Sequence, residues 1–161
     1  MQLYREFFLL IEHLNKAGLP YAVIGGIAVA LHHVPRFTED IDILARPADL
    51  DDYERVLKEA GYLRSADPMT FANTNLTLHR FVKPSLDDDL IIVDLMLGHE
   101  KEHEHMIANA EAVNSYIGKV YLASRSDLIT LKRKRNSPQD AADIAHLQTE
   151  DPDRKSGLES Q

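Results

Sequence analysis

Apolar residues recur at helical spacing over much of the chain. Between Leu3 and Leu14 they lie three or four positions apart, which predicts a helix over residues 2–17 that Gly18 and Pro20 end. Similar spacing, turn residues and start signals such as Ser137-Pro138 predict the remaining helices. We expect them at residues 27–31, 47–60, 98–112, 124–135 and 138–148.

Alternation with period two and short continuous apolar runs predict strands. We expect them at residues 21–24, 40–45, 76–82, 90–97, 113–117 and 119–122. The polar segment 64–75 is expected to be mostly loop, and the acidic stretch 87–89 to be a hairpin tip. These elements predict an α+β fold, a two-layer α/β arrangement with a mixed β-sheet flanked by helices and with C-terminal helices. A single domain should span residues 1–149, followed by a disordered polar tail at 150–161.

The strand expected at residues 40–45 carries the first candidate chemistry. Asp40 and Asp42 lie two positions apart, so both carboxylates should point to one face of the strand, while Ile41 and Ile43 point to the other. Neighbouring carboxylates repel each other unless a positive charge lies between them. A divalent cation is the natural partner, and hard oxygen ligands suit Mg²⁺.

A third carboxylate, Asp94, interrupts the most apolar run of the chain, residues 90–97. Such a run is typical of a central strand, in which a lone charge is costly to bury. Asp94 therefore lies either at an exposed strand end or beside Asp40 and Asp42 as a third metal ligand. We favour the metal ligand, because the other two carboxylates are already present.

Two glycines, Gly25 and Gly26, separate the strand at residues 21–24 from the short helix that follows. They could meet the conformational needs of a tight turn. Alternatively, backbone N–H groups at the start of the helix could hold a phosphate. Taken alone, the glycine pair favours the tight turn.

Composition narrows the classes of function. The chain has 161 residues, no cysteine and a formal net charge of −8. The lack of cysteine excludes disulfides and thiolate metal sites and fits a reducing compartment, so we expect a cytoplasmic protein. The acidic balance argues against broad nucleic-acid affinity. No segment has the pattern of a signal peptide or of a membrane span, so we expect no membrane partner.

One motif points to a different chemistry. The segment from His99 to His103 reads HEKEH and matches the HExxH pattern of helical zinc sites. In such a site both histidines bind zinc and Glu100 acts as the base. Charged residues run all around this helix and a third ligand is not evident. We therefore interpret the segment as a solvated helix start and keep a zinc hydrolase as a less favoured alternative.

The motifs together resemble the DNA polymerase beta-type nucleotidyltransferase superfamily. The shared features are the Gly25-Gly26 turn, Arg36 and Thr38 in the spacer, the Asp40-Ile41-Asp42 strand and the later Val93-Asp94-Leu95. Farther along, residues 127–132 and 140–144 resemble the C-terminal part of the AbiEii-like branch, which includes toxins of toxin–antitoxin pairs. Members of that branch often carry Arg before the first acid of the second segment, where this chain has Gln139.

The resemblance implies the nucleotidyltransferase fold and the transfer of a nucleotidyl group from an NTP, such as ATP, to a hydroxyl, with release of pyrophosphate. It implies that Asp40, Asp42 and Asp94 are catalytic and bind two Mg²⁺ ions, or Mn²⁺, and that Asp94 helps to remove the hydroxyl proton. It also implies a set of nucleotide- and phosphate-binding residues. These are Gly25, Gly26, Arg36, Thr38 and Lys132.

Simpler roles compete for four of the polar residues. Arg36 could form a salt bridge within its loop, and Lys132 could be a surface residue of a basic run, each about as readily as it could bind phosphate. Asp140 is expected to cap the last helix. Asp143 is an additional site candidate.

The acceptor is left open by the sequence. A tRNA end or a protein side chain would suit an AbiEii-like toxin with a cognate antitoxin. A small molecule would suit an enzyme like the aminoglycoside and lincosamide nucleotidyltransferases, which share the Asp-x-Asp strand. The basic run at residues 132–135 slightly favours a polyanion, whereas the net charge of −8 disfavours it. A catalytically weak binding or antitoxin module is a further alternative, but such a module would have no reason to retain three mutually repelling acids.

Overall fold

A central mixed sheet organises the computed structural model, which describes residues 2–71, 73–135 and 137–149. Within these residues eight strands pair in the order β3-β5-β6-β2-β1-β8-β7, and β4 pairs with β5. The strands are β1 (Ala22–Ile24), β2 (Asp40–Ala45), β3 (Leu63–Arg64), β4 (Met69–Thr70), β5 (Leu76–Pro84), β6 (Leu90–Gly98), β7 (Glu111–Ser115) and β8 (Gly118–Leu122). Parallel β2–β6 and β1–β8 pairs occur beside antiparallel ones, so the predicted mixed sheet is confirmed.

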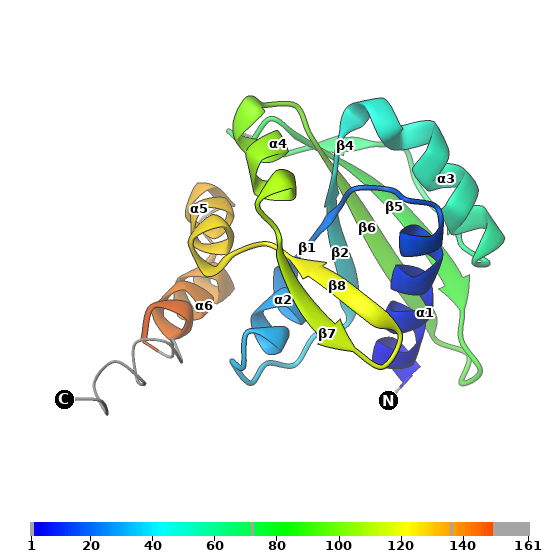
Figure 1. Cartoon of the computed structure of the whole chain (residues 1–161), viewed down its shortest axis with the longest axis horizontal. Helices are drawn as coiled ribbons and strands as arrows, with labels where there is room; N and C mark the ends of the chain where they lie inside the picture. Colours follow the sequence, from blue (N-terminus) through cyan, green and yellow to red (C-terminus); the bar gives the residue numbers. More distant parts are fainter. Residues whose placement is uncertain (1, 72, 136, 150–161) are drawn as a thin grey trace.

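The helices lie on both sides of the sheet (Figure 1). They are α1 (Gln2–Lys16), α2 (Gly25–Leu31), α3 (Leu50–Glu59), α4 (Lys101–Ala108), α5 (Arg125–Arg135) and α6 (Pro138–Thr149), with a 3₁₀ turn at Pro47–Asp49 before α3. Figure 1 shows α1 and α3 on one side of the molecule and the C-terminal pair α5 and α6 on the other.

The sequence pattern of β2 explains which side of the sheet is the core. Ile41 and Ile43 are fully buried, and α1, which packs against β2 and α3, buries the apolar stripe from Phe7 to Leu14. Burial of these side chains removes apolar surface from water, which is the main driving force for folding. Because side chains alternate along a strand, the carboxylates of Asp40 and Asp42 point away from these isoleucines.

The segment 64–75 is mostly loop, as expected, but two short strands in this region were not predicted. Strands β3 and β4 have exposed residues and pair with β5. Their pairing comes from a neighbour distant in sequence, so local pattern did not reveal it. The helix expected to reach residue 112 ends at Ala108, because Glu111 already pairs with Leu122 of β8. The expected tail at 150–161 lies outside the described residues.

None of the helices in the described part of the chain combines the length and the apolar character that crossing a bilayer requires.

Candidate active site

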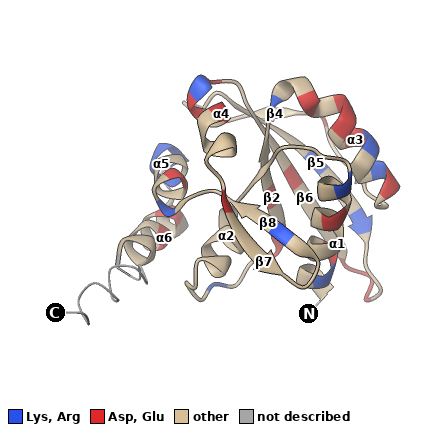
Figure 2. Ribbon diagram, in the orientation of Figure 1, with Lys and Arg blue, Asp and Glu red and all other residues tan. Residues whose placement is uncertain are grey.

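Three carboxylates come together where β2 and β6 run side by side. In the parallel register Asp42 is the direct partner of Asp94, and Asp40 lies two residues earlier on the same face of β2. Figure 2 shows these acidic positions inside the sheet on β2 and β6. The fold therefore brings together the three residues that the sequence singled out as metal ligands.

These carboxylates line a cavity of about 560 Å³. Four of the five expected phosphate-binding residues line the same cavity: Gly25, Gly26, Arg36 and Thr38. Two arginines that the sequence analysis did not single out, Arg80 and Arg135, also border it. The glycine turn and the carboxylate face thus open into one space.

Crowding of negative charge marks this cavity. Burial, followed by the charges of Asp94 and Asp40, raises the pKa of Asp42 to about 7, and Arg135 and Lys132 only partly oppose the effect. Burial and the charge of Asp94 also raise the pKa of Asp40 above its usual range. Without another cation, the protein therefore pays a free-energy cost to keep both groups ionised near neutral pH.

Arg80 supplies one of the missing positive charges. It lies on β5 directly opposite Asp94, and its Nε and Nη2 donate hydrogen bonds of 2.8 and 2.9 Å to the two carboxylate oxygens of Asp94. Asp94 is only 4% exposed, so this two-point contact provides the buried carboxylate with a charged partner.

The donor set suits a hard divalent cation, because three carboxylates offer oxygen ligands only. As the side chains stand, no group of three or more His, Asp or Glu residues in the described ranges is arranged to hold a metal ion. Both oxygens of Asp94 accept hydrogen bonds from Arg80 in this arrangement. The residues fit Mg²⁺ by the chemistry of their oxygen donors.

The two glycines keep the cavity open beside these acids. Gly25 has φ of +70°, and a Cβ there would lie 2.0 Å from Oδ2 of Asp42. A Cβ on Gly26 would lie 2.6 Å from Oγ1 of Thr38 and 2.9 Å from Nη1 of Arg36. Gly25 is therefore required both by its backbone conformation and by the close approach of Asp42. No side chain caps α2 at this turn.

A buried ion-pair group joins the loop between α2 and β2 to the C-terminal helices. The Oδ2 atom of Asp143 on α6 lies 3.0 Å from Lys132 Nζ and 3.1 Å from Arg36 Nη1. Lys132 is 5% exposed, so the alternative that it is a surface lysine is wrong: its side chain turns inward to reach Asp143. Arg36 does form a salt bridge, but with Asp143 of α6 and not within its own loop as the alternative had it.

The expected capping role of Asp140 is confirmed. Ser137 Oγ accepts a hydrogen bond from the Asp140 backbone N–H at 3.0 Å, and Asp140 accepts one from the Ser137 backbone N–H at 3.1 Å. Arg135 also donates two hydrogen bonds to Asp140. These contacts hold α5 and α6 at a fixed angle beside the cavity.

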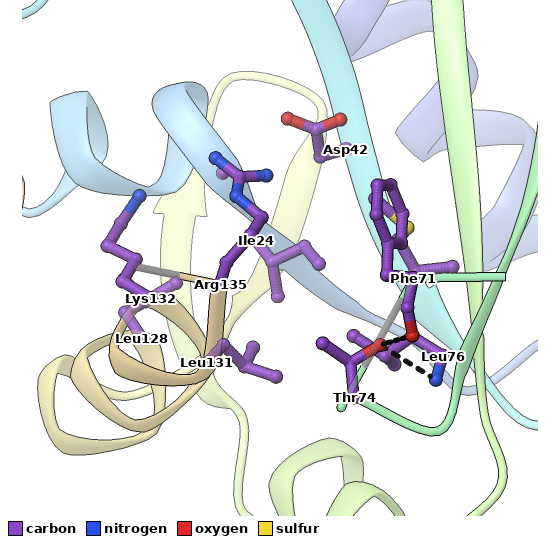
Figure 3. Close-up of a pocket in the computed structure, with 11 residues that line it drawn as sticks. Ile24, Asp42, Phe71, Thr74, Leu76, Leu128, Leu131, Lys132 and Arg135 are labelled. Carbon is purple, nitrogen blue, oxygen red and sulfur yellow. Dashed lines mark hydrogen bonds between the residues drawn. The ribbon is translucent and has the colours of Figure 1, made fainter. Parts of the chain in front are cut away.

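A narrow slot continues from the cavity toward α5 (Figure 3). Asp42, Arg135 and Lys132 form its polar end. The figure shows α5 side chains along one wall and the segment after β4 along the other. The apolar lining residues drawn there include Leu128, Leu131, Phe71 and Leu76.

Comparison with known proteins places this geometry in a family. A sequence profile described as aminoglycoside-2''-adenylyltransferase matches residues 6–89, just over half of the chain. The chain belongs to the aminoglycoside-2''-adenylyltransferase family. The matched segment includes the glycine turn, Asp40, Asp42 and Arg80, and the family is one of nucleotidyltransferases. This supports the superfamily expected from the sequence and gives no support to the AbiEii-like branch.

Solved structures of similar fold agree with this family. They include the lincomycin-bound lincosamide antibiotic adenylyltransferase LnuA, with 13% identity, a TM-score of 0.59 and coverage of 90% of this chain and 96% of that one. A putative nucleotidyltransferase from Thermotoga maritima has 15% identity, a TM-score of 0.58 and coverage of 98% and 94%. ANT(2'')-Ia in complex with adenylyl-2''-tobramycin has 17% identity, a TM-score of 0.52 and coverage of 92% and 89%. A search of curated proteins finds no match.

The HEKEH segment does not form a second centre in this family member. His103 is fully buried, and its Nδ1 accepts a hydrogen bond from the Glu100 backbone N–H in a capping box at the start of α4. His99 instead contacts Thr77 of β5. In the described part of the chain, these side chains are not in a group of three that could hold a metal ion. The expected helix start is confirmed, but His103 is a buried cap and not a solvated residue.

Arg80 could have been found from the sequence. It falls on the face of β5 that Leu76, Leu78 and Val82 also share, so it interrupts an otherwise apolar alternation. An arginine at such a position needs an acidic partner, and Asp94 interrupts the next strand in the same way. Arg135 gave no comparable signal, because it sits within a run of four basic residues.

Proposed function

We propose that this chain transfers AMP from ATP to a hydroxyl group of a small molecule and releases pyrophosphate. The observation that carries the proposal is the convergence of Asp40, Asp42 and Asp94 on the cavity that also borders the Gly25-Gly26 turn. The adenylyltransferase family to which the chain belongs supports ATP as the donor. The site would be contained in a single domain at residues 1–149.

In the reaction, the acceptor oxygen attacks the α-phosphorus of ATP, and the bond from that phosphorus to the pyrophosphate oxygen breaks. Asp94 is the carboxylate nearest to β5 and would accept the proton of the hydroxyl. When bound to Asp40, Asp42 and Asp94, two Mg²⁺ ions would neutralise the triphosphate and make the hydroxyl more acidic.

The remaining groups would bind the nucleotide. Gly25 and Gly26 leave room for the triphosphate beside Asp42. Arg36 and Lys132 both form salt bridges with Asp143. In the nucleotide complex, both would also bind the phosphates. Thr38, whose Oγ1 donates a weak hydrogen bond of 3.3 Å to the Asp40 carbonyl, would donate to a phosphate instead.

A small-molecule acceptor is better supported than a tRNA or a protein. Lys132, Lys134 and Arg135 of the basic run each contact a carboxylate, so little of that charge is free to attract a polyanion. Figure 2 likewise shows acidic and basic residues together on α5. The adenylyltransferases of similar fold are named with lincomycin and with adenylyl-2''-tobramycin.

Release of pyrophosphate tests this proposal. Wild-type protein with Mg²⁺ should release pyrophosphate from ATP faster than from the other three NTPs when a small-molecule extract is added. Asp40→Asn, Asp42→Asn and Asp94→Asn should each lower the rate at least 100-fold, since each removes a ligand of the proposed metals. Asp51→Asn is the matched control, because Asp51 is exposed on α3. Equal rates in wild type and Asp42→Asn would overturn the site assignment.

A further inference from the structure

Two rows of side chains cross the cavity face of the sheet. In the first row Arg80, Asp94 and Asp42 are direct partners on β5, β6 and β2. Directly paired residues on neighbouring strands point to the same face of the sheet. Residues two positions away along each strand also point to this face and form a second row beside the first. That second row is apolar and runs over β4, β5, β6 and β2 as Met69, Leu78, Met96 and Leu44. Three of these residues line the cavity: Met69, Leu78 and Met96. We call these three residues the apolar strip.

Two residues of the apolar strip, Met69 on β4 and Leu78 on β5, lie on the side of the carboxylates that faces away from the glycine turn. The strand order runs β5-β6-β2-β1, and Gly25 follows β1 directly. This step rests on the proposed function, in which the glycine side holds the triphosphate. We therefore expect the acceptor to approach Asp94 from the β5 side, across the apolar strip.

Two exposed apolar side chains extend this surface to the rim of the cavity. Met69 is 53% exposed and Phe37 is 83% exposed, and both line the cavity. They come from different segments, the loop before β2 and strand β4. Leu78 and Met96 also line the cavity and are almost fully buried. Large exposed apolar groups that border a cavity are typical of ligand contacts.

The charges on this side do not suit a polycation. Besides the three aspartates, the charged residues that line this cavity in the described part of the chain are Arg36, Arg80, Arg135 and Glu39. Arg80 is positive, and its guanidinium would repel an ammonium group. Glu39 is a single exposed acid, and the three aspartates are committed to Arg80 and to the proposed metals. An acceptor with several amines would therefore lack partners.

We propose that the acceptor is an amphipathic hydroxyl compound with at most one positive charge. Its apolar group lies against the apolar strip and Phe37, and its reacting hydroxyl points to Asp94. This acceptor differs in chemistry from a polyamino sugar, although the chain belongs to a family described by aminoglycosides. The contact area is apolar, so binding strength should rise with the size of the apolar group.

A matched set of glycosides tests the acceptor class by binding. The probes are methyl β-glucoside, hexyl β-glucoside and a tetra-amino sugar, each titrated against protein saturated with Mg²⁺ and a non-hydrolysable ATP analogue and followed by ligand-observed NMR. Hexyl β-glucoside should bind at least 10-fold more tightly than the other two. Met69→Asp should weaken its binding at least 10-fold and leave the dissociation constant of the ATP analogue unchanged.

Leu63→Asp is the control variant, because Leu63 is an exposed apolar residue of β3 that does not line the cavity. It should bind hexyl β-glucoside like the wild type. Tighter binding of the tetra-amino sugar, failure of all three probes to bind, or equal binding by Met69→Asp and wild type would each overturn the acceptor class. Failure of the proposed function is recognised separately, because the ATP analogue would then bind equally well to wild type and Asp42→Asn.

Discussion

Arg80 of β5 donates hydrogen bonds to both carboxylate oxygens of Asp94 on β6, with donor–acceptor distances of 2.8 and 2.9 Å. Asp94 is buried while the Arg80 side chain remains 40% exposed. The pair thus stabilises a buried carboxylate from the side of the cavity. It also occupies the oxygens that a metal ion would need, so guanidinium and metal should substitute for each other in stabilising Asp94.

Replacement of Arg80 tests this substitution. Arg80→Met should lower the free energy of unfolding in EDTA by about 1–3 kcal/mol, because Asp94 loses its charged partner. Added Mg²⁺ should then raise the melting temperature more in Arg80→Met than in the wild type. Thermal denaturation in EDTA and in Mg²⁺ measures both effects. Arg5→Met, at an exposed site of α1, should change neither. An equal Mg²⁺ effect in the two proteins would show that Arg80 and the metal do not share Asp94.

A pair of glycines with nearly the same φ separates backbone strain from steric crowding. Gly25 has φ of +70° and Gly18 has φ of +68°, but only at Gly25 would a Cβ meet a neighbour, Asp42. Gly18→Ala should cost about 1–2 kcal/mol from strain alone and leave nucleotide binding intact. Gly25→Ala should cost more and abolish binding of the ATP analogue, because Asp42 must move. Chemical denaturation and calorimetric titration of both variants provide the comparison. Similar nucleotide affinity in the two variants would contradict it.

The raised pKa of Asp42 predicts how stability depends on pH in metal-free protein. Because its pKa is about 7 when folded and 3.8 when unfolded, the folded state binds more protons between these values. Its contribution to stability is therefore full below about pH 4 and is lost as the pH rises to 7. Asp42→Asn should remove this trend and be more stable than the wild type at pH 8 by roughly 2–4 kcal/mol. Urea denaturation in EDTA from pH 5 to 8 measures it, and parallel pH profiles for the two proteins would refute it.

The salt bridge between Asp143 of α6 and Lys132 of α5 should stabilise the packing of these two helices. Asp143→Asn should cost about 2–4 kcal/mol, because it leaves the buried Lys132 and the nearby Arg36 with a neutral partner. Lys132→Met should remove much of that cost, so a double-mutant cycle should give a coupling energy of about 1–3 kcal/mol. Asp127→Asn, on the first turn of α5, serves as the control. Additive effects of Asp143→Asn and Lys132→Met would mean that the ion pair contributes little.

Much of the fold follows from local pattern, as β2 illustrates. The alternation of Asp40, Ile41, Asp42 and Ile43 predicted the strand, its buried face and its carboxylate face. The strands β3 and β4 were missed because their residues are exposed and only pairing with β5 makes them strands. The local sequence of such a strand does not show which other strand it will pair with.

The candidate site was likewise predicted from the sequence only in part. Asp94 was predicted to join Asp40 and Asp42 because a charge within an apolar strand demands a partner. The inward turn of Lys132 could not be predicted, since it depends on Asp143 lying across the α5–α6 pair. The apolar strip was also hidden, because Met69, Leu78 and Met96 come from three strands whose register is set only in the folded sheet.

The fate of the label in ATP tests the central claim most directly. Wild-type protein is incubated with Mg²⁺, ATP labelled in the α-phosphate and whole cell extract, and the products are separated into RNA, protein and small molecules. The account predicts that label enters a small molecule, that an equal amount of pyrophosphate appears, and that Asp42→Asn abolishes both. Label in RNA or protein alone, or unchanged labelling by Asp42→Asn, would contradict it.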